Sequence, residues 1–333
     1  MIKKAKDTYS SIGMRYAIMY IVYYFIIMVI LYIYKVVAGE LPEGTPLYLT
    51  DGLVRFLLIY PLMLFLVAKK VPAFDMPKKK LGVKGFLVSF CIIFAFGRLS
   101  AMIETNIMTK ITGNNALSNS QSLNIAKDSS VALNIIMLSI IVPIFEELLF
   151  RKFLVSRIVN YGEKTAILVS GIMFCLFHAS PSQLTYTFVL GCMLAYLFIR
   201  TGNILYTIAI HILFNLAGTS FTMFMRQIAD FTEMISKADS AALTQYITEH
   251  LTDLSGLIIY LLFSYLLIAV GIILAIVKRK NIVFENHPEE IEKGKQLSTA
   301  FLNAGMILYV VLFVAVIILN LNGYSQLDIL YLL

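Results

Sequence analysis

The sequence predicts an all-α protein, a polytopic transmembrane helical bundle of about nine spans (eight to nine) with a cytoplasmic N-terminus. Of its 333 residues, 59% are hydrophobic and only 14% are charged, which excludes an ordinary soluble domain. The apolar residues form continuous runs of roughly 16–24 residues, the length of membrane-spanning helices, whereas a transmembrane β-barrel has short alternating segments. We therefore expect a multi-pass protein of the cell membrane, with its orientation set by the placement of basic residues.

Polar turns and charged loops separate the apolar runs and give their order. The first run follows Lys3, Lys4 and Lys6 and is too long for the apolar part of a cleavable signal peptide. The expected spans lie at 16–37, 53–67, 86–103, from 131 to the turn at 160–162, 165–179, 184–199, 204–224, 257–277 and 300–319. Between them, residues 104–130 are expected to form an extended polar loop, with side-chain acceptors in 128–130 for the start of a helix, and 225–255 to contain an amphipathic helix at 241–251.

Basic residues follow the positive-inside bias of membrane proteins. With the N-terminus in the cytoplasm, 20 of the 27 Lys and Arg lie in cytoplasmic segments, namely 1–15, 69–84, 151–164, Arg200 and 278–295. The net charge of +7 is therefore explained by loops anchored to anionic lipid headgroups, and no nucleic-acid partner is expected. The sequence carries no signal for an oligomeric state.

Two adjacent carboxylates, Glu146 and Glu147, stand near the end of an apolar run, and two later runs each contain a histidine, His178 or His211. An ionisable group within a span costs about 2.5 kcal/mol or more, so it is a candidate for function. In an antiparallel hairpin that turns near Tyr161, Glu146 lies 15 residues before the turn and His178 lies 17 residues after it. The two then reach depths within about 3 Å of each other, and a site shared with His211 in the cytoplasmic half of the membrane is compatible with these spacings.

Spacing within each segment adds detail. Phe174 and His178 are four residues apart, as are His211 and Asn215, so each pair shares one face of a helix. Glu147 and Arg151 have the same spacing, which suits an ion pair. Neighbouring residues of a helix point about 100° apart, so only one of the two glutamates readily faces a given cavity. Pro143, three residues before Glu146, is expected to bend the helix there.

These residues resemble the three signature motifs of the CPBP family, which includes the CAAX prenyl endopeptidases and the bacteriocin-processing or self-immunity (Abi) proteins. The motifs are Glu146-Glu147-x-x-x-Arg151, Phe174-x-x-x-His178 and His211-x-x-x-Asn215, in this order on three expected spans. The resemblance implies a catalytic core at 131–224, preceded by N-terminal spans and a polar loop at 1–130 and followed by a polar segment and two spans at 225–333.

The resemblance also implies intramembrane proteolysis of a membrane-associated peptide or protein. By analogy, Glu146 and His178 would hold and activate a water molecule, and His211 and Asn215 would stabilise the oxyanion. Glu147, Arg151 and Phe174 would support the site. A metal-free reaction is favoured, because Asn is a poor zinc ligand and the sequence has no His-Glu-x-x-His helix, but zinc held by Glu146, His178 and His211 is the alternative.

Other interpretations stay open. Taken alone, Glu147 and Arg151 fit an interfacial ion pair, and each histidine fits a hydrogen bond to a neighbouring helix. Two other classes of function also fit: a non-catalytic immunity or scaffold protein that binds a bacteriocin or another partner, and a proton-coupled transporter, because intramembrane carboxylates and histidines also build proton relays. The three motifs together favour a shared catalytic site.

Overall fold

The computed structural model describes residues 1–42, 44–112, 130–227 and 240–322, and in these ranges the secondary structure is entirely helical. The N-terminal part contains α1 (Ile2–Ala38), the continuous series α2 (Gly44–Leu53), η1 (Val54–Ile59) and α3 (Tyr60–Lys70), and α4 (Gly82–Thr112). The central part contains α6 (Val131–Asn134), η3 (Ile135–Ile141), α7 (Val142–Glu147), η4 (Leu148–Val155), α8 (Ser156–Ile158), η5 (Val159–Tyr161), α9 (Glu163–Phe177), η6 (Pro181–Gln183), α10 (Leu184–Thr201) and α11 (Ile204–Gln227). The C-terminal part contains α13 (Ser240–Glu249), α14 (Leu251–Lys278), η7 (Arg279–Asn281), α15 (Gln296–Phe301) and α16 (Ala304–Leu321).

The predicted class, a multi-pass helical bundle, is confirmed. Among the described residues, eight helices are long and apolar enough to cross a membrane. One of the nine expected spans, at 165–179, is not among these eight. It corresponds to α9, which has only 15 residues and ends at Phe177. It is therefore shorter than the roughly 17–25 residues of a spanning helix.

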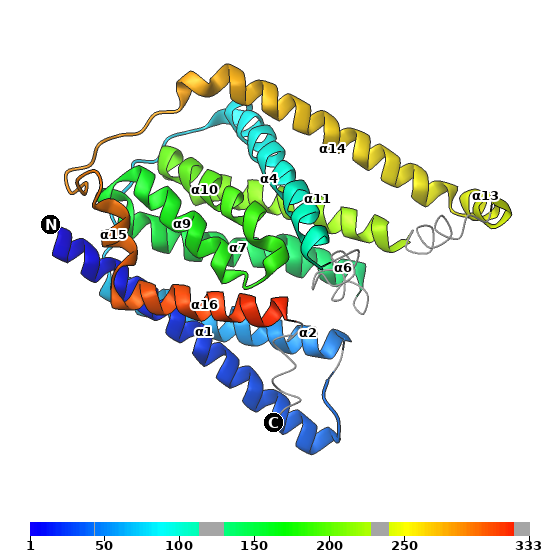
Figure 1. The fold of residues 1–333 in the computed structure, drawn as a ribbon, viewed down its shortest axis with the longest axis horizontal. Helices are drawn as coiled ribbons and strands as arrows, with labels where there is room; N and C mark the ends of the chain where they lie inside the picture. The colour runs from blue at the N-terminus through cyan, green and yellow to red at the C-terminus, as the bar shows by residue number, and fades with distance from the viewer. Residues whose placement is uncertain (43, 113–129, 228–239, 323–333) are drawn as a thin grey trace.

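The helices of the central part lie between two outer groups (Figure 1). α9 and α10 pack side by side, and α11 packs against η3 and α7. On one side of this centre α4 packs against α10, and α14 covers α4; on the other side α16 packs along α1. The segment with the three motifs is thus enclosed by helices from both ends of the chain.

Two expected boundaries were wrong, and both errors have a physical reason. Residues 104–112, expected as loop, continue α4, and the helix accommodates polar side chains there because they bond to its own carbonyls: Thr105 to Ala101 O and Asn106 to Met102 O. The remainder of that expected loop, 113–129, lies outside the described residues. At the N-terminus α1 begins at Ile2 instead of 16, because its first turns bury Tyr9 and Ile12 against the bundle.

Other local expectations agree with the structure. Ser130 caps α6 by accepting a hydrogen bond from the Leu133 N–H at 3.2 Å. The expected amphipathic helix is α13. The last expected span is divided into α15 and α16 by a break at 302–303, after which Asn303 caps α16 by accepting from the Met306 N–H.

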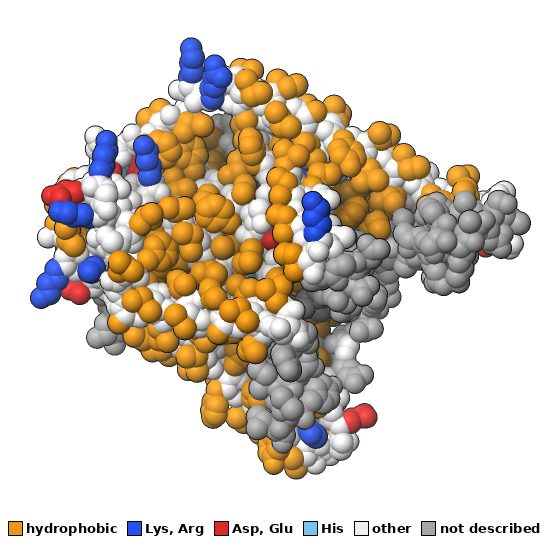
Figure 2. Space-filling model, viewed as in Figure 1, with side chains coloured by type: hydrophobic (Ala, Val, Ile, Leu, Met, Phe, Trp, Pro, Cys, Tyr) orange, Lys and Arg blue, Asp and Glu red, His pale blue; other side chains and the backbone are white. Residues whose placement is uncertain are grey.

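The surface separates lipid-facing and charged regions. Large apolar side chains such as Phe25, Leu57 and Ile259 are more than two-thirds exposed, as expected for helices that face acyl chains. Charged side chains instead gather at the end of the bundle that carries the N-terminus and α15 (Figure 2). The basic segments assigned to the cytoplasm thus share one end, while the orientation relative to the cell stays a prediction.

Candidate active site

The structure brings the three motif segments together around the Glu146 carboxylate. Glu146 lies on α7, His178 follows the last residue of α9, and His211 lies on α11. Glu146 Oε1 is 3.7 Å from His178 Nε2, and Glu146 Oε2 is 3.6 Å from His211 Nε2. These separations exceed direct hydrogen bonds, and polar groups at this distance are commonly bridged by water.

A backbone contact fixes the orientation of His178. Its Nδ1 lies 2.8 Å from the carbonyl oxygen of Phe174. Because a carbonyl can only accept, Nδ1 carries a proton, and in the neutral ring Nε2 presents its lone pair toward Glu146. The helix ends immediately before this residue, and Ala179 takes a left-handed conformation with φ of 49°, after which the chain continues into η6, whose Ser182 and Gln183 also line the cavity described below.

Glu147 lies behind the site rather than in it, as the angle between neighbouring helical residues predicts. It is fully buried, and its Oε1 lies 2.9 Å from His211 Nδ1. Its Oε2 lies 3.2 Å from Nε of Arg151, which is also fully buried and whose Nη2 reaches Gly191 O at 3.5 Å. Glu147 and Arg151 thus form the expected pair, and both side chains are buried in the interior of the protein.

The Phe174 ring supports both histidines and the arginine. The Arg151 guanidinium lies over it at 4.6 Å, and the ring meets His178 edge-on with centroids 4.7 Å apart. The centroid of His211 is 5.9 Å away. The side chain is completely buried, so this aromatic platform limits the movement of three of the motif residues.

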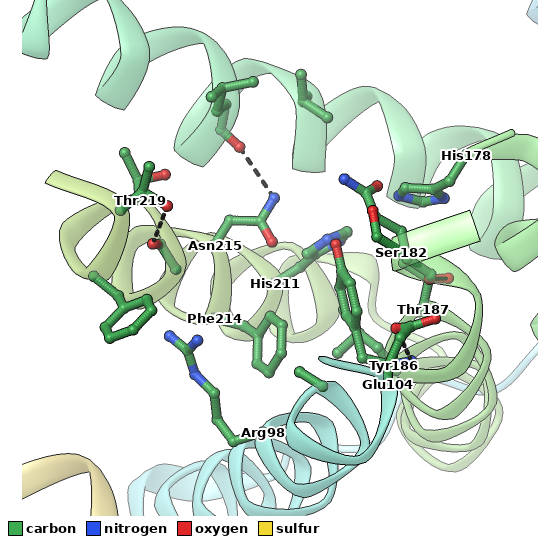
Figure 3. A pocket seen from close by; sticks show the side chains of 18 of the residues that line it. Arg98, Glu104, His178, Ser182, Tyr186, Thr187, His211, Phe214, Asn215 and Thr219 are labelled. Atoms are coloured by element: carbon green, nitrogen blue, oxygen red, sulfur yellow. Dashed lines mark hydrogen bonds between the residues drawn. The ribbon is translucent and has the colours of Figure 1, made fainter. Parts of the chain in front are cut away.

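Pro143 explains how Asn215 is held. The Val142 N–H donates to Met137 O, five residues back, in the π-helical segment η3. The next residue is Pro143, which has no N–H, so neither residue 142 nor residue 143 supplies a donor to Leu138 O. Asn215 Nδ2 donates to this carbonyl at 3.0 Å from α11 (Figure 3). The proline expected to bend the helix therefore also creates an acceptor for a motif residue, while one amide hydrogen of Asn215 is left for another partner.

A cavity of about 400 Å³ adjoins these groups. Glu146, His178, His211 and Asn215 line it together with residues of α4 and α10 (Figure 3). Glu146 is 7% exposed and His211 only 2%, so the site is accessible mainly through this cavity. Its volume falls within the range of small-molecule and peptide side-chain pockets.

Two lining residues of α4 were not among the predicted site residues. The Glu104 carboxylate accepts hydrogen bonds from Thr185 N at 2.7 Å and Tyr186 N at 3.3 Å, in the first turn of α10. Arg98 lies within the expected span 86–103, so the rule that singled out Glu146, an ionisable group in an apolar run, could have found it.

The choice between a metal-free reaction and zinc stays a prediction. In the part of the chain that the structure describes, no three His, Cys, Asp or Glu side chains are grouped so that they could hold a metal ion. Glu146 directs one oxygen to each histidine, and the fourth polar group, Asn215, is a poor ligand for zinc.

Comparison with known proteins agrees with the motif resemblance. Residues 128–217 match the model of the Rce1-like family, described as type II CAAX prenyl endopeptidase Rce1-like. The UPF0177 protein YxdF of Lactococcus lactis subsp. lactis is 28% identical over 120 residues, which cover 36% of this chain and 64% of that protein, slightly less than two-thirds of its length. No solved structure gives a significant match. The chain is thus a multi-pass membrane protein in which residues 128–217, from before α6 into α11, are similar to the Rce1-like CAAX prenyl endopeptidases.

Proposed function

We propose that this protein is an intramembrane endopeptidase of the CPBP type that hydrolyses a peptide bond in a membrane-associated peptide or protein. The observation that carries the proposal is the position of the Glu146 carboxylate, which lies between two imidazole Nε2 atoms at 3.6 and 3.7 Å on the wall of the cavity. The match of residues 128–217 to a family of CAAX endopeptidases supports the reaction class.

In the proposed reaction a water molecule lies between Glu146 and His178. Glu146 removes a proton from this water as its oxygen attacks the carbonyl carbon of the scissile bond. The C=O electrons move to oxygen and give a tetrahedral oxyanion. The proton on Glu146 then passes to the amide nitrogen, the C–N bond breaks, and an acid and an amine are released.

His211 and Asn215 are the proposed donors to the oxyanion. An ionised Glu147 only accepts hydrogen bonds, so the His211 nitrogen beside it, Nδ1, must carry a proton. His211 can then donate from Nε2 when both ring nitrogens carry a proton. Asn215 contributes its second amide hydrogen, because the first is held by Leu138 O. The reaction needs no metal in this proposal.

A cleavage assay on the purified protein in lipid nanodiscs tests the proposal. Fluorogenic apolar peptides serve as substrates, with and without a chelator. We expect cleavage to survive chelation and to be abolished by Glu146→Ala and by His178→Ala, with the thermal unfolding of both variants unchanged. His287→Ala is the matched control. This histidine lies in the loop that follows η7, contacts Glu163 at the start of α9, and does not line the cavity. Cleavage by the Glu146→Ala protein would refute the proposal. If the wild type cleaves no peptide and both site variants still bind a partner, the non-catalytic scaffold is favoured.

A further inference from the structure

A cation from outside the matched segment lies in the active-site cavity. Arg98 belongs to α4, whereas the Rce1-like match begins at residue 128. Its side chain lines the same cavity as Glu146, His178 and His211. Figure 3 shows the guanidinium extending from α4 toward the side of the cavity where Asn215 and Thr219 lie.

The contacts of Arg98 hold it in place without neutralising it. Its Nη2 donates to the Tyr260 hydroxyl at 2.9 Å, and this hydroxyl in turn donates to Ala217 O at 2.7 Å. The guanidinium carbon lies 5.3 Å from the Phe94 ring centroid and 5.5 Å from that of Phe214. Two aromatic rings and one phenol therefore fix the position of the charged group.

Arg98 has no ion pair with a carboxylate among the residues that the structure describes, and its buried Nε has no hydrogen-bond partner there. Other buried or half-buried arginines are satisfied in one of two ways: Arg55 and Arg151 pair with Asp51 and Glu147, and Arg157 donates to backbone carbonyls such as Val71 O. Glu104 also lines the cavity and is the cavity acid nearest to Arg98 in the sequence, but its carboxylate already accepts hydrogen bonds from backbone N–H groups of α10. The positive charge of Arg98 is thus left for something that enters the cavity.

A charge within a membrane bundle is costly unless a partner compensates it. A guanidinium offers five N–H donors in a planar fork, which matches the two oxygens of a carboxylate. From this geometry, and resting on the proposed function, we propose that Arg98 binds a carboxylate of the substrate and so selects peptides that carry one near the bond to be cleaved. The carboxylate comes either from the C-terminal end of the peptide or from an Asp or Glu side chain.

Peptide binding to the full-length protein in nanodiscs tests this proposal independently of catalysis. The probes are three versions of one dye-labelled apolar octapeptide: with a free C-terminal carboxylate, with a C-terminal amide, and with a C-terminal amide and one internal glutamate. We expect the wild type to bind at least one acidic probe about tenfold or more tightly than the neutral amide, in line with hydrogen bonds to charged groups. Which acidic probe gains affinity identifies the source of the carboxylate.

Three variants assign the preference to this residue. Arg98→Gln is expected to bind all three probes equally, while Arg98→Lys retains part of the preference because it keeps the charge but loses the fork. Arg55→Gln is the matched control: it also removes a charge from a partly buried arginine, but outside the cavity, and should keep the wild-type preference. Equal binding of the three probes by the wild type, or an unchanged preference in folded Arg98→Gln protein, overturns the proposal. If the wild type prefers an acidic probe but cleaves none, the proposed function fails while the assignment of Arg98 stands.

Discussion

Replacing Pro143 by alanine tests how the fold positions Asn215. The new N–H at residue 143 can donate within the helix to Leu138 O, five residues back, or to Ser139 O, four residues back. Asn215 now competes for Leu138 O with a local donor, and the hydrogen bond at stake contributes about 0.5–1.5 kcal/mol. This range corresponds to a change of about twofold to tenfold in the population of the orientation that the amide now adopts.

The variant should therefore lose activity without losing stability. Complete removal of one oxyanion donor typically lowers kcat about 10²–10³-fold, but a partly displaced Asn215 should lower it only about twofold to tenfold, the factor that about 0.5–1.5 kcal/mol corresponds to, with little change in KM. The unfolding temperature should remain equal or rise, because proline is unfavourable within a helix. Peptide cleavage by purified protein gives kcat and KM, and thermal unfolding in detergent gives stability.

A double-mutant cycle with Asn215→Ala supplies the control. Since Pro143 is proposed to act only through Asn215, the double variant should be no slower than Asn215→Ala alone. Wild-type kcat in Pro143→Ala, or losses that multiply independently in the double variant, would show that this reasoning is incorrect.

Three substitutions test contacts that hold the fold together, each by its change in unfolding free energy. Glu147→Gln leaves the fully buried Arg151 without a counter-charge, and we expect a loss of about 3–5 kcal/mol. Asp51→Asn is the comparison, because Asp51 and Arg55 form a partly exposed pair and its loss should be smaller. Glu104→Gln removes a charged acceptor from the N-terminus of α10 and should cost about 1–3 kcal/mol; an unchanged value would mean that the two N–H groups find other partners. Gly305→Ala would place a Cβ 1.8 Å from the Ser10 carbonyl oxygen, so α16 must move away from α1. We expect this to cost about 1–3 kcal/mol of unfolding free energy, and an unaltered unfolding temperature would disprove it.

The arrangement of the motif segments could be predicted from the sequence because a lipid environment leaves few explanations for a buried charge. Glu146, His178 and His211 lie in apolar runs, and helix geometry alone places Glu146 and His178 at one depth. The structure places these two side chains 3.7 Å apart. Their catalytic roles stay a prediction, since distance alone does not establish chemistry.

Contacts between distant helices could not be predicted in the same way. Arg98 is held by Tyr260, 162 residues later, and Glu104 by the start of α10, and no local pattern encodes either pairing. Helix ends were also misjudged where polar residues such as Thr105 and Asn106 bond to their own backbone, since composition alone indicated a loop.

The π-helical segment before Pro143 shows a further limit of sequence patterns. The proline predicts a disturbance in the helix, but not the register that the chain adopts around it. Only the structure shows that Val142 bonds to Met137 O and that Leu138 O is left for Asn215.

The most direct test of the account measures single-turnover cleavage by Glu146→Gln protein, because glutamine keeps the shape of the side chain and removes the base. If Glu146 activates the water, the rate should fall about 10²–10⁴-fold while peptide binding and the unfolding temperature stay at wild-type values. A folded Glu146→Gln protein that cleaves the peptide at the wild-type rate would contradict the account.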